Sequence, residues 1–297
     1  MFRPGNSVPR FHMVWGTGKG LVDILTAALD NHPNRSQILF QFDSRVDDLL
    51  VEGGRVVGCH GVREKDGETG EDFEARAPIT IVASGGICGK IDLVKKHWHK
   101  PLGEPPETIL NGSHRFADGR VLFSAEKNAG ARITHLDHHW NYAAGVHHPR
   151  PDPRKPGHGL SLVPPKSALW MNWEGRRIGP VALVTSFDTK FQVERICQES
   201  RKYSWQILNR KIALKELAVS GSEFNDAIRD RKIFAFLKNV LFGNRALVDD
   251  LVRNCPDFVI ADIIDELAQK MNRLNGDDAV DPRLLRDEIE RYDAMIA

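Results

Sequence analysis

The segment from Ala77 to Gly89 constrains the fold more than any other part of this sequence. After Pro78 it runs ITIVAS, a β-branched and apolar stretch, and it ends in the paired glycines Gly85 and Gly86. A run that is apolar on both faces predicts a strand buried in a parallel sheet. A strand that ends in two glycines lets backbone approach a flat cofactor or a phosphate without a Cβ clash. Taken alone, such a turn is more often purely structural.

The flanking residues predict mixed helix and strand structure. The spacing of the apolar residues predicts a helix over residues 16–32, and the pattern predicts strands at Ile38–Phe42, Arg45–Glu52 and 55–63. Asp66-Gly67 predicts a hairpin return. The fold class expected from this pattern is therefore α/β, or α+β for the chain as a whole.

The pattern changes after the proline-rich residues 149–165, which predict a loop or a crossing between domains. Beyond them we expect a hairpin near Trp170–Arg177 and then mainly helices, over Ser204–Ser220, over Asp257–Leu274 and at the C-terminus. The last helix should be capped by Asp281 with Pro282 at its first position. Two domains follow as expectations: residues 1–137 and residues 138–297.

Composition excludes several classes of protein. Lys and Arg number 41 against 40 Asp and Glu, so the near-neutral balance argues against a nucleic-acid partner bound through bulk charge. No stretch is apolar for the roughly 18–20 residues of a transmembrane span. The four cysteines are widely spaced, which argues against a disulfide framework and favours a reducing cytoplasm.

Several motifs together resemble one flavoprotein family. They are the Ala83–Gly86 turn after a β-meander, the later Phe116–Gly119 (FADG), and NWEGRRI at 172–178. The resemblance is to the fumarate reductase, succinate dehydrogenase and 3-ketosteroid dehydrogenase flavoproteins, and it is closest to the bacterial FAD-binding dehydrogenases. Ile178 stands where the family has an aromatic residue, which argues against a true fumarate reductase.

The resemblance implies an FAD-binding Rossmann-like domain with a β-meander, followed by a mainly helical capping domain. It also implies FAD as cofactor, a small apolar substrate of the ketosteroid kind, and removal of a hydride and a proton from adjacent carbons, or the reverse reaction. The residues it places at the cofactor are Val46 near the adenine, Ala83, Ser84, Gly85 and Gly86 near the phosphate and ribitol, and Asp118 with Gly119 near the flavin.

The family's opening GxGxxG unit and its closing flavin segment have no counterpart in these 297 residues. Because that opening unit supplies the helix N-terminus that holds the pyrophosphate, we expect the isolated chain to bind FAD weakly or not at all. The alternative function is therefore a non-catalytic remnant, or one subunit of a split flavoprotein that needs a complementing chain.

Catalytic residues are less well defined. His114 and Arg115 precede Asp118 and could stabilise negative charge on a flavin, although a surface pair is the simpler interpretation. Tyr203 could line a pocket for a flat apolar substrate, although aromatic core packing is more common. The many histidines of residues 135–158 are spaced unlike common zinc motifs, and we expect no metal site. GTGKG at 16–20 departs from the phosphate-loop spacing and predicts a helix start.

Overall fold

Helices and antiparallel sheets make up the computed structural model, which describes residues 14–65, 68–155, 157–179 and 189–296. The described chain forms two compact units. One unit consists of Ala27–Lys100 and Ser113–His139, here called the sheet unit. The other takes in the described residues up to Thr26, Pro101–Gly112 and the described residues from Trp140 onward, and is here called the helical unit. The predicted α/β composition is confirmed, while the predicted boundary at residue 137 stays a prediction.

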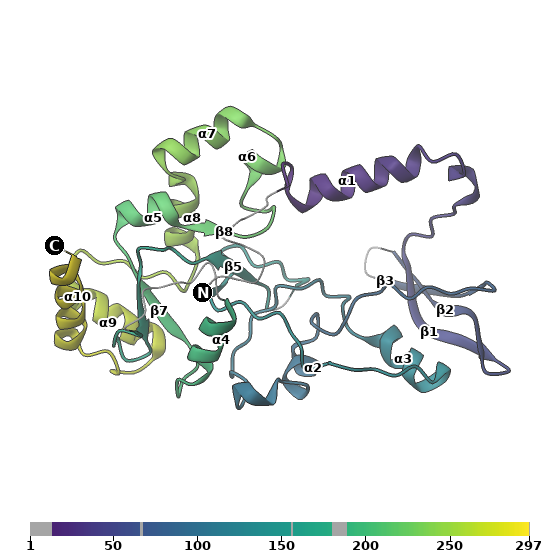
Figure 1. The fold of residues 1–297 in the computed structure, drawn as a ribbon, viewed down its shortest axis with the longest axis horizontal. Helices are drawn as coiled ribbons and strands as arrows, with labels where there is room; N and C mark the ends of the chain where they lie inside the picture. The colour runs from purple at the N-terminus through teal and green to yellow at the C-terminus, as the bar shows by residue number, and fades with distance from the viewer. Residues whose placement is uncertain (1–13, 66–67, 156, 180–188, 297) are drawn as a thin grey trace, which may run out of the picture. The chain divides into compact units, whose positions relative to one another are not determined.

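The sheet unit is built on a three-stranded antiparallel meander in the order β1-β2-β3 (Figure 1). Its strands are β1 (Ser44–Glu52), β2 (Arg55–Lys65) and β3 (Glu68–Arg76). Gly53 and Gly54 form the first turn with left-handed backbone, which glycine adopts without steric cost. The predicted return at Asp66-Gly67 lies outside the described residues, but β2 and β3 do pair across it. Its helices are α2 (Ile91–Lys96) and α3 (Arg120–Ala129), with short 3-10 turns η1 (Arg35–Gln37) and, at its edge, η2 (Lys100–Leu102).

Helix α1 (Thr17–Asp30) confirms the helix predicted over residues 16–32 and runs across the boundary between the two units. Two predicted strands are wrong. Ile38–Phe42 is irregular, and Leu39 and Phe42 are 78% and 76% exposed. Residues 77–86 are also irregular, and Ile79 and Ile81 are 77% and 86% exposed. An apolar run becomes a buried strand only where neighbouring strands pair with it, and no strand in the described part of the chain pairs with these two segments.

The helical unit contains two small antiparallel sheets, ordered β4-β5-β8 and β6-β7. The predicted hairpin near Trp170–Arg177 is confirmed in part. The chain turns at Gly175 and returns through a single Met171–Arg177 bridge, while the main partner of β6 is the more distant β7. The strands are β4 (Gly145–His147), β5 (Gly159–Val163), β6 (Leu169–Asn172), β7 (Ser204–Ile207) and β8 (Ala218–Val219).

Seven helices lie within the described part of this unit. The helix predicted over Ser204–Ser220 is wrong at both ends, because strands β7 and β8 flank a short α5. The helix predicted from Asp257 begins only at Ile264. Asp281 accepts a hydrogen bond of 2.8 Å from the N–H of Arg283, so the predicted cap of the last helix is confirmed. The helices are α4 (Thr189–Cys197), α5 (Arg210–Glu216), α6 (Asp226–Arg229), α7 (Ile233–Phe242), α8 (Arg245–Asn254), α9 (Ile264–Asn275) and α10 (Pro282–Ile296).

Two apolar clusters form most of the core of the helical unit. In one, Leu251 of α8 is completely buried among residues of β5, β8 and α8. In the other, Met171, Met271 and Leu285 are completely buried where α9 and α10 pack together against β6. Figure 1 shows α9 and α10 side by side. Burial of this kind stabilises a fold by about 25 cal/mol for each Å² of apolar surface removed from water. No helix in the described residues has both the length and the apolar character to cross a bilayer.

Candidate functional site

The two segments predicted to contact FAD lie against each other in the sheet unit. The N–H of Gly89 donates a 2.8 Å hydrogen bond to the carbonyl of Ala117, and Ile87 is 3% exposed beneath the turn. A Cβ on Gly119 would come within 2.8 Å of the side chains of Ile87 and Phe123. The glycine turn and the Asp118-Gly119 motif therefore pack directly against each other, although they are separated by about thirty residues in the chain.

The four residues before this junction are the most accessible part of it. Ala83, Ser84, Gly85 and Gly86 are exposed. Gly85 has a φ of +80°, and a Cβ on Gly86 would meet no atom within 4 Å. Open backbone with small side chains fits the close approach of a flat cofactor, as the sequence predicted for this turn. The cofactor roles of these residues stay a prediction.

Asp118 is already engaged by the first residue of α3. Its carboxylate accepts hydrogen bonds from Nε and the backbone N–H of Arg120, at 2.9 and 3.1 Å. Burial acts to raise the pKa of Asp118, but these bonds and the positive charge of Arg120 outweigh it, and the pKa is lowered. Arg120 therefore orients the aspartate and favours its ionised form.

A β-bulge joins this junction to the meander. Val46 pairs with Gly61, and Asp48 pairs with His60, so Asp47 is the extra residue of β1. The bulge allows two successive carboxylates to reach the same helix. Asp47 bonds Arg120, and Asp48 accepts bonds from Ser124 and, at 2.6 Å, from Asn128 Nδ2. Val46, predicted near the adenine, is thus the strand residue next to this polar network.

The bulge pair and its helix partners were not predicted from the sequence. Hydrogen bonding by Arg45 and Arg120 lowers the pKa of Asp47, and hydrogen bonding by Ser124 lowers that of Asp48. Gly61 in the interior of β2 is the sequence signal that could have indicated an irregular strand. The structure gives the reason, because a Cβ there would come within 1.8 Å of the Arg45 carbonyl oxygen. The network fixes the position of α3 relative to β1, and through α3 that of Gly119.

The three catalytic candidates fall in different units. His114 and Arg115 belong to the sheet unit and are exposed. The Arg115 guanidinium lies 4.6 Å from the centre of the Phe116 ring, and the His114 ring lies 5.3 Å from it. Tyr203 belongs to the helical unit, where it packs edge-to-face on Trp205 at 5.9 Å and where burial raises its pKa. Their catalytic roles stay a prediction.

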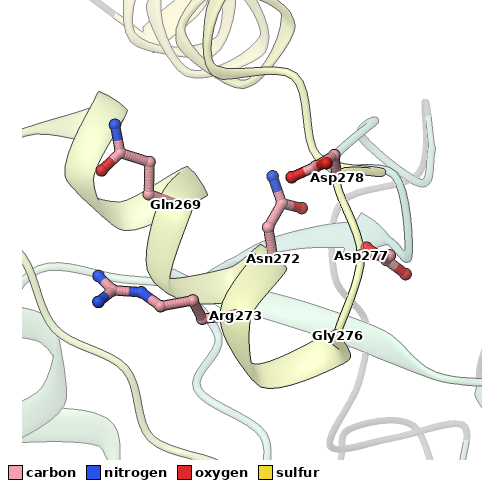
Figure 2. Close-up of a pocket in the computed structure, with 6 residues that line it drawn as sticks. All are labelled: Gln269, Asn272, Arg273, Gly276, Asp277 and Asp278. Atoms are coloured by element: carbon pink, nitrogen blue, oxygen red, sulfur yellow. The ribbon is translucent and has the colours of Figure 1, made fainter.

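The hollow shown in Figure 2 lies in the helical unit and is lined mainly by polar residues. It has a volume of about 480 Å³ and lies at the C-terminal end of α9. Both ends of the Asn272 amide are bonded to the backbone of Val280, at 2.9 and 2.8 Å. Asp277 is bonded to Arg201 and to the N–H of Ala279. These polar groups close the turn between α9 and α10, and none of the residues predicted to contact FAD or substrate lines the hollow.

Comparison with known proteins identifies the family. A family model described as "FAD binding domain" matches residues 3–295. The chain belongs to the FAD binding domain family. This match confirms FAD as the predicted cofactor, and it agrees with the open glycine turn described above.

Two similar proteins with names show which flavoproteins this chain resembles. A "KsdD-like steroid dehydrogenase" of Mycolicibacterium smegmatis is 36% identical over 303 aligned positions, covering 99% of this chain and 54% of the relative. A KsdD-like steroid dehydrogenase of Mycobacterium tuberculosis is 38% identical over 281 positions, covering 91% of this chain and 48% of the relative. The predicted resemblance to ketosteroid dehydrogenase-type flavoproteins is confirmed. The chain spans about half the length of these curated relatives.

Proposed function

We propose that this chain is part of an FAD-dependent oxidoreductase that dehydrogenates adjacent carbons of a small, flat, apolar substrate of the steroid class. The observation that supports this most directly is the junction of the two motifs. There a backbone hydrogen bond joins Gly89 to Ala117, while Ala83–Gly86 is exposed to solvent. The relatives named as steroid dehydrogenases supply the substrate class. The enzyme's activity, substrate and partners are part of this proposal.

In this proposal the chain's own residues bind and orient. When bound, FAD supplies the hydride acceptor, which no protein side chain can provide. The backbone of Ala83–Gly86 would hold the cofactor's phosphate and ribitol region, and Val46 would contact its adenine. Asp118, oriented by Arg120, would accept a hydrogen bond from the flavin end. Arg115 supplies positive charge that favours negative charge on the cofactor, and His114 next to it offers a ring nitrogen for hydrogen bonding.

The proposal assigns the substrate to residues 138–297 as a capping domain and the cofactor to residues 1–137 as a Rossmann-like domain. Tyr203 and Trp205 offer an edge-to-face aromatic pair that suits a flat apolar molecule. The assignment of a cytoplasmic location stays a prediction from cysteine usage; all four cysteines are free.

A second candidate function has one observation in its favour. Ile79, Ile81 and Val82 are 77%, 86% and 44% exposed, directly before the proposed cofactor turn. No strand in the described residues pairs with this extended segment, so strands of a complementing chain could complete it. In that case the isolated chain binds no FAD, and the flavoprotein forms only with its partner.

Calorimetric titration of FAD into the purified chain distinguishes the two candidates. A saturable one-to-one complex with a visible flavin absorption band supports cofactor binding by the chain itself. No heat of binding and a colourless protein support the split assembly. In that case the titration is repeated in the presence of the complementing segment, supplied as the remaining half of a relative.

Gly86→Val tests the turn in whichever assembly binds FAD. We expect at least about a tenfold loss of affinity, because a β-branched side chain would stand where the cofactor approaches. Gly85→Val is a poorer test, since its φ of +80° strains any side chain. Gly112→Val is the matched control, because Gly112 is also exposed with ordinary φ and no atom within 4 Å of a Cβ. Unchanged affinity in Gly86→Val contradicts the assignment of the turn to FAD.

A further inference from the structure

A histidine and carboxylate cluster lies in the sheet unit and includes none of the residues assigned to FAD. His99 follows α2, and Asp137 and His138 follow α3, so the cluster joins segments 38 residues apart. His99 Nδ1 lies 2.7 Å from Asp137 Oδ2, and His138 Nε2 lies 4.0 Å from Asp137 Oδ1. One ligand atom from each of the three residues falls within 4.8 Å of the other two.

We propose that His99, Asp137 and His138 bind a divalent transition metal ion of the Zn²⁺ type. Two imidazole nitrogens and one carboxylate oxygen are a known donor set for zinc with an open fourth position. Donor atoms around a tetrahedral zinc stand about 3.3 Å apart, from metal–ligand bonds of about 2.0–2.1 Å. His99 and His138 approach different oxygens of the Asp137 carboxylate, at 2.7 and 4.0 Å. One donor atom from each residue lies within 4.8 Å of the other two, so side-chain rotation is the step that brings the donors to the zinc spacing.

The local backbone holds two of the three donors in position. The N–H of His138 donates a 3.0 Å hydrogen bond to the carbonyl of His135, which closes a turn around Asp137. His135 has a φ of +58°, a conformation that costs energy for a residue with a side chain. Such strain often marks a ligand or active site. The turn presents Asp137 and His138 on the same side as His99.

The surrounding rings favour a metal over a simple ion pair. The His138 ring lies 5.6 Å from that of His99 and 4.7 Å from that of His135. Neutral imidazole is the form of histidine that binds metal, and three rings gathered at one carboxylate offer more nitrogen donors than a single ion pair uses.

A second cluster shows why not every such grouping binds metal. His148, His158 and Glu223 of the helical unit also bring their ligand atoms within 4.8 Å. There, Nδ1 of His148 accepts a 3.0 Å bond from the N–H of Arg150, so the ring proton is on Nε2, where it bonds Glu223 at 2.8 Å. A metal at Nε2 would displace that proton to Nδ1 and set it against the N–H of Arg150. This cluster is therefore a hydrogen-bonded structural group.

The test uses Zn²⁺ alone with the full chain, purified without a polyhistidine tag. By isothermal titration at neutral pH we expect one Zn²⁺ per chain. We expect His138→Gln and His99→Gln each to weaken binding at least about tenfold, since each removes a donor. His158→Gln is the matched control and should leave the affinity unchanged.

Cobalt substitution supplies a second measurement that does not depend on comparing variants. Co²⁺ bound by two nitrogens and an oxygen gives a visible absorption band, which His138→Gln should abolish. Circular dichroism checks that the variants keep their fold, as expected for the exposed His138. No Zn²⁺ binding by the wild-type chain, equal affinity in His138→Gln, or loss in His158→Gln instead would overturn the proposal.

Discussion

The interior of each unit of this chain is stabilised by a different kind of interaction. In the helical unit, completely buried apolar side chains such as Met271 and Leu285 fill the space between α9, α10 and β6. In the sheet unit, few apolar residues are buried, and polar side chains join β1 to α3 through Asp47 and Asp48. Apolar packing depends on volume, whereas the polar junction depends on precise geometry and on charge. The proposed cofactor turn belongs to the sheet unit, whose parts are joined by this polar junction.

The largest loss of stability should come from a substitution in the apolar core of the helical unit. Leu285→Ala removes a completely buried side chain between α9 and α10, and we expect it to lower the free energy of unfolding by about 2–5 kcal/mol. Urea unfolding followed by circular dichroism measures it. Leu274→Ala is the control, because Leu274 of α9 is 42% exposed. Similar losses in both variants would show that the apolar cluster is not the main support of this unit.

A smaller effect is expected where the sheet unit packs backbone against backbone. A Cβ on Gly89 would lie 2.4 Å from the carbonyl oxygen of His114 and 2.9 Å from that of Ala117. Gly89→Ala should therefore separate the two motif segments and cost about 1–3 kcal/mol, measured by urea unfolding. Gly86→Ala, with no atom within 4 Å of the added Cβ, should be nearly neutral in the same measurement. If Gly89→Ala is also neutral, the two segments are not packed as described.

The smallest loss of stability should come from acid, which protonates Asp48 in the polar junction of the sheet unit. The pKa of Asp48 is lowered by its bond with Ser124, so the folded form holds its proton less tightly than the unfolded chain does. The resulting stabilisation is present above the ordinary value of 3.8 and is lost as pH falls through the lowered folded-state pKa. We expect it to amount to less than about 1 kcal/mol, because the carboxylate is partly solvated.

Urea midpoints measured at neutral pH and below pH 3.8, in the wild-type chain and in Asp48→Asn, test this expectation. The fall in stability with acid should be smaller in Asp48→Asn, because the amide does not titrate. Asp72→Asn, at an exposed position of β3, is the control and should keep the wild-type dependence. Equal acid dependence in wild type and Asp48→Asn would show that the junction does not rely on this charge.

The sequence by itself determined the elements that depend on near neighbours. Helix α1, strands β1 and β2, and the cap of α10 at Asp281 follow from residues within a few positions of one another. The cofactor family was also readable, because its motifs are short stretches of chain. These features need no knowledge of distant residues, since helix spacing, turn glycines and caps act locally.

Only the tertiary structure decided the features that need a distant partner. The Ile79–Val82 run has the composition of a buried strand, yet it is exposed, because strand formation depends on neighbours that composition does not specify. Strand β6 takes β7 as its main partner. The β-bulge turns Asp47 and Asp48 toward one helix, and His99 meets Asp137 and His138 across 38 residues. Hydrogen bonds and metal ligands require atoms within a few ångströms, and folding alone brings such atoms together.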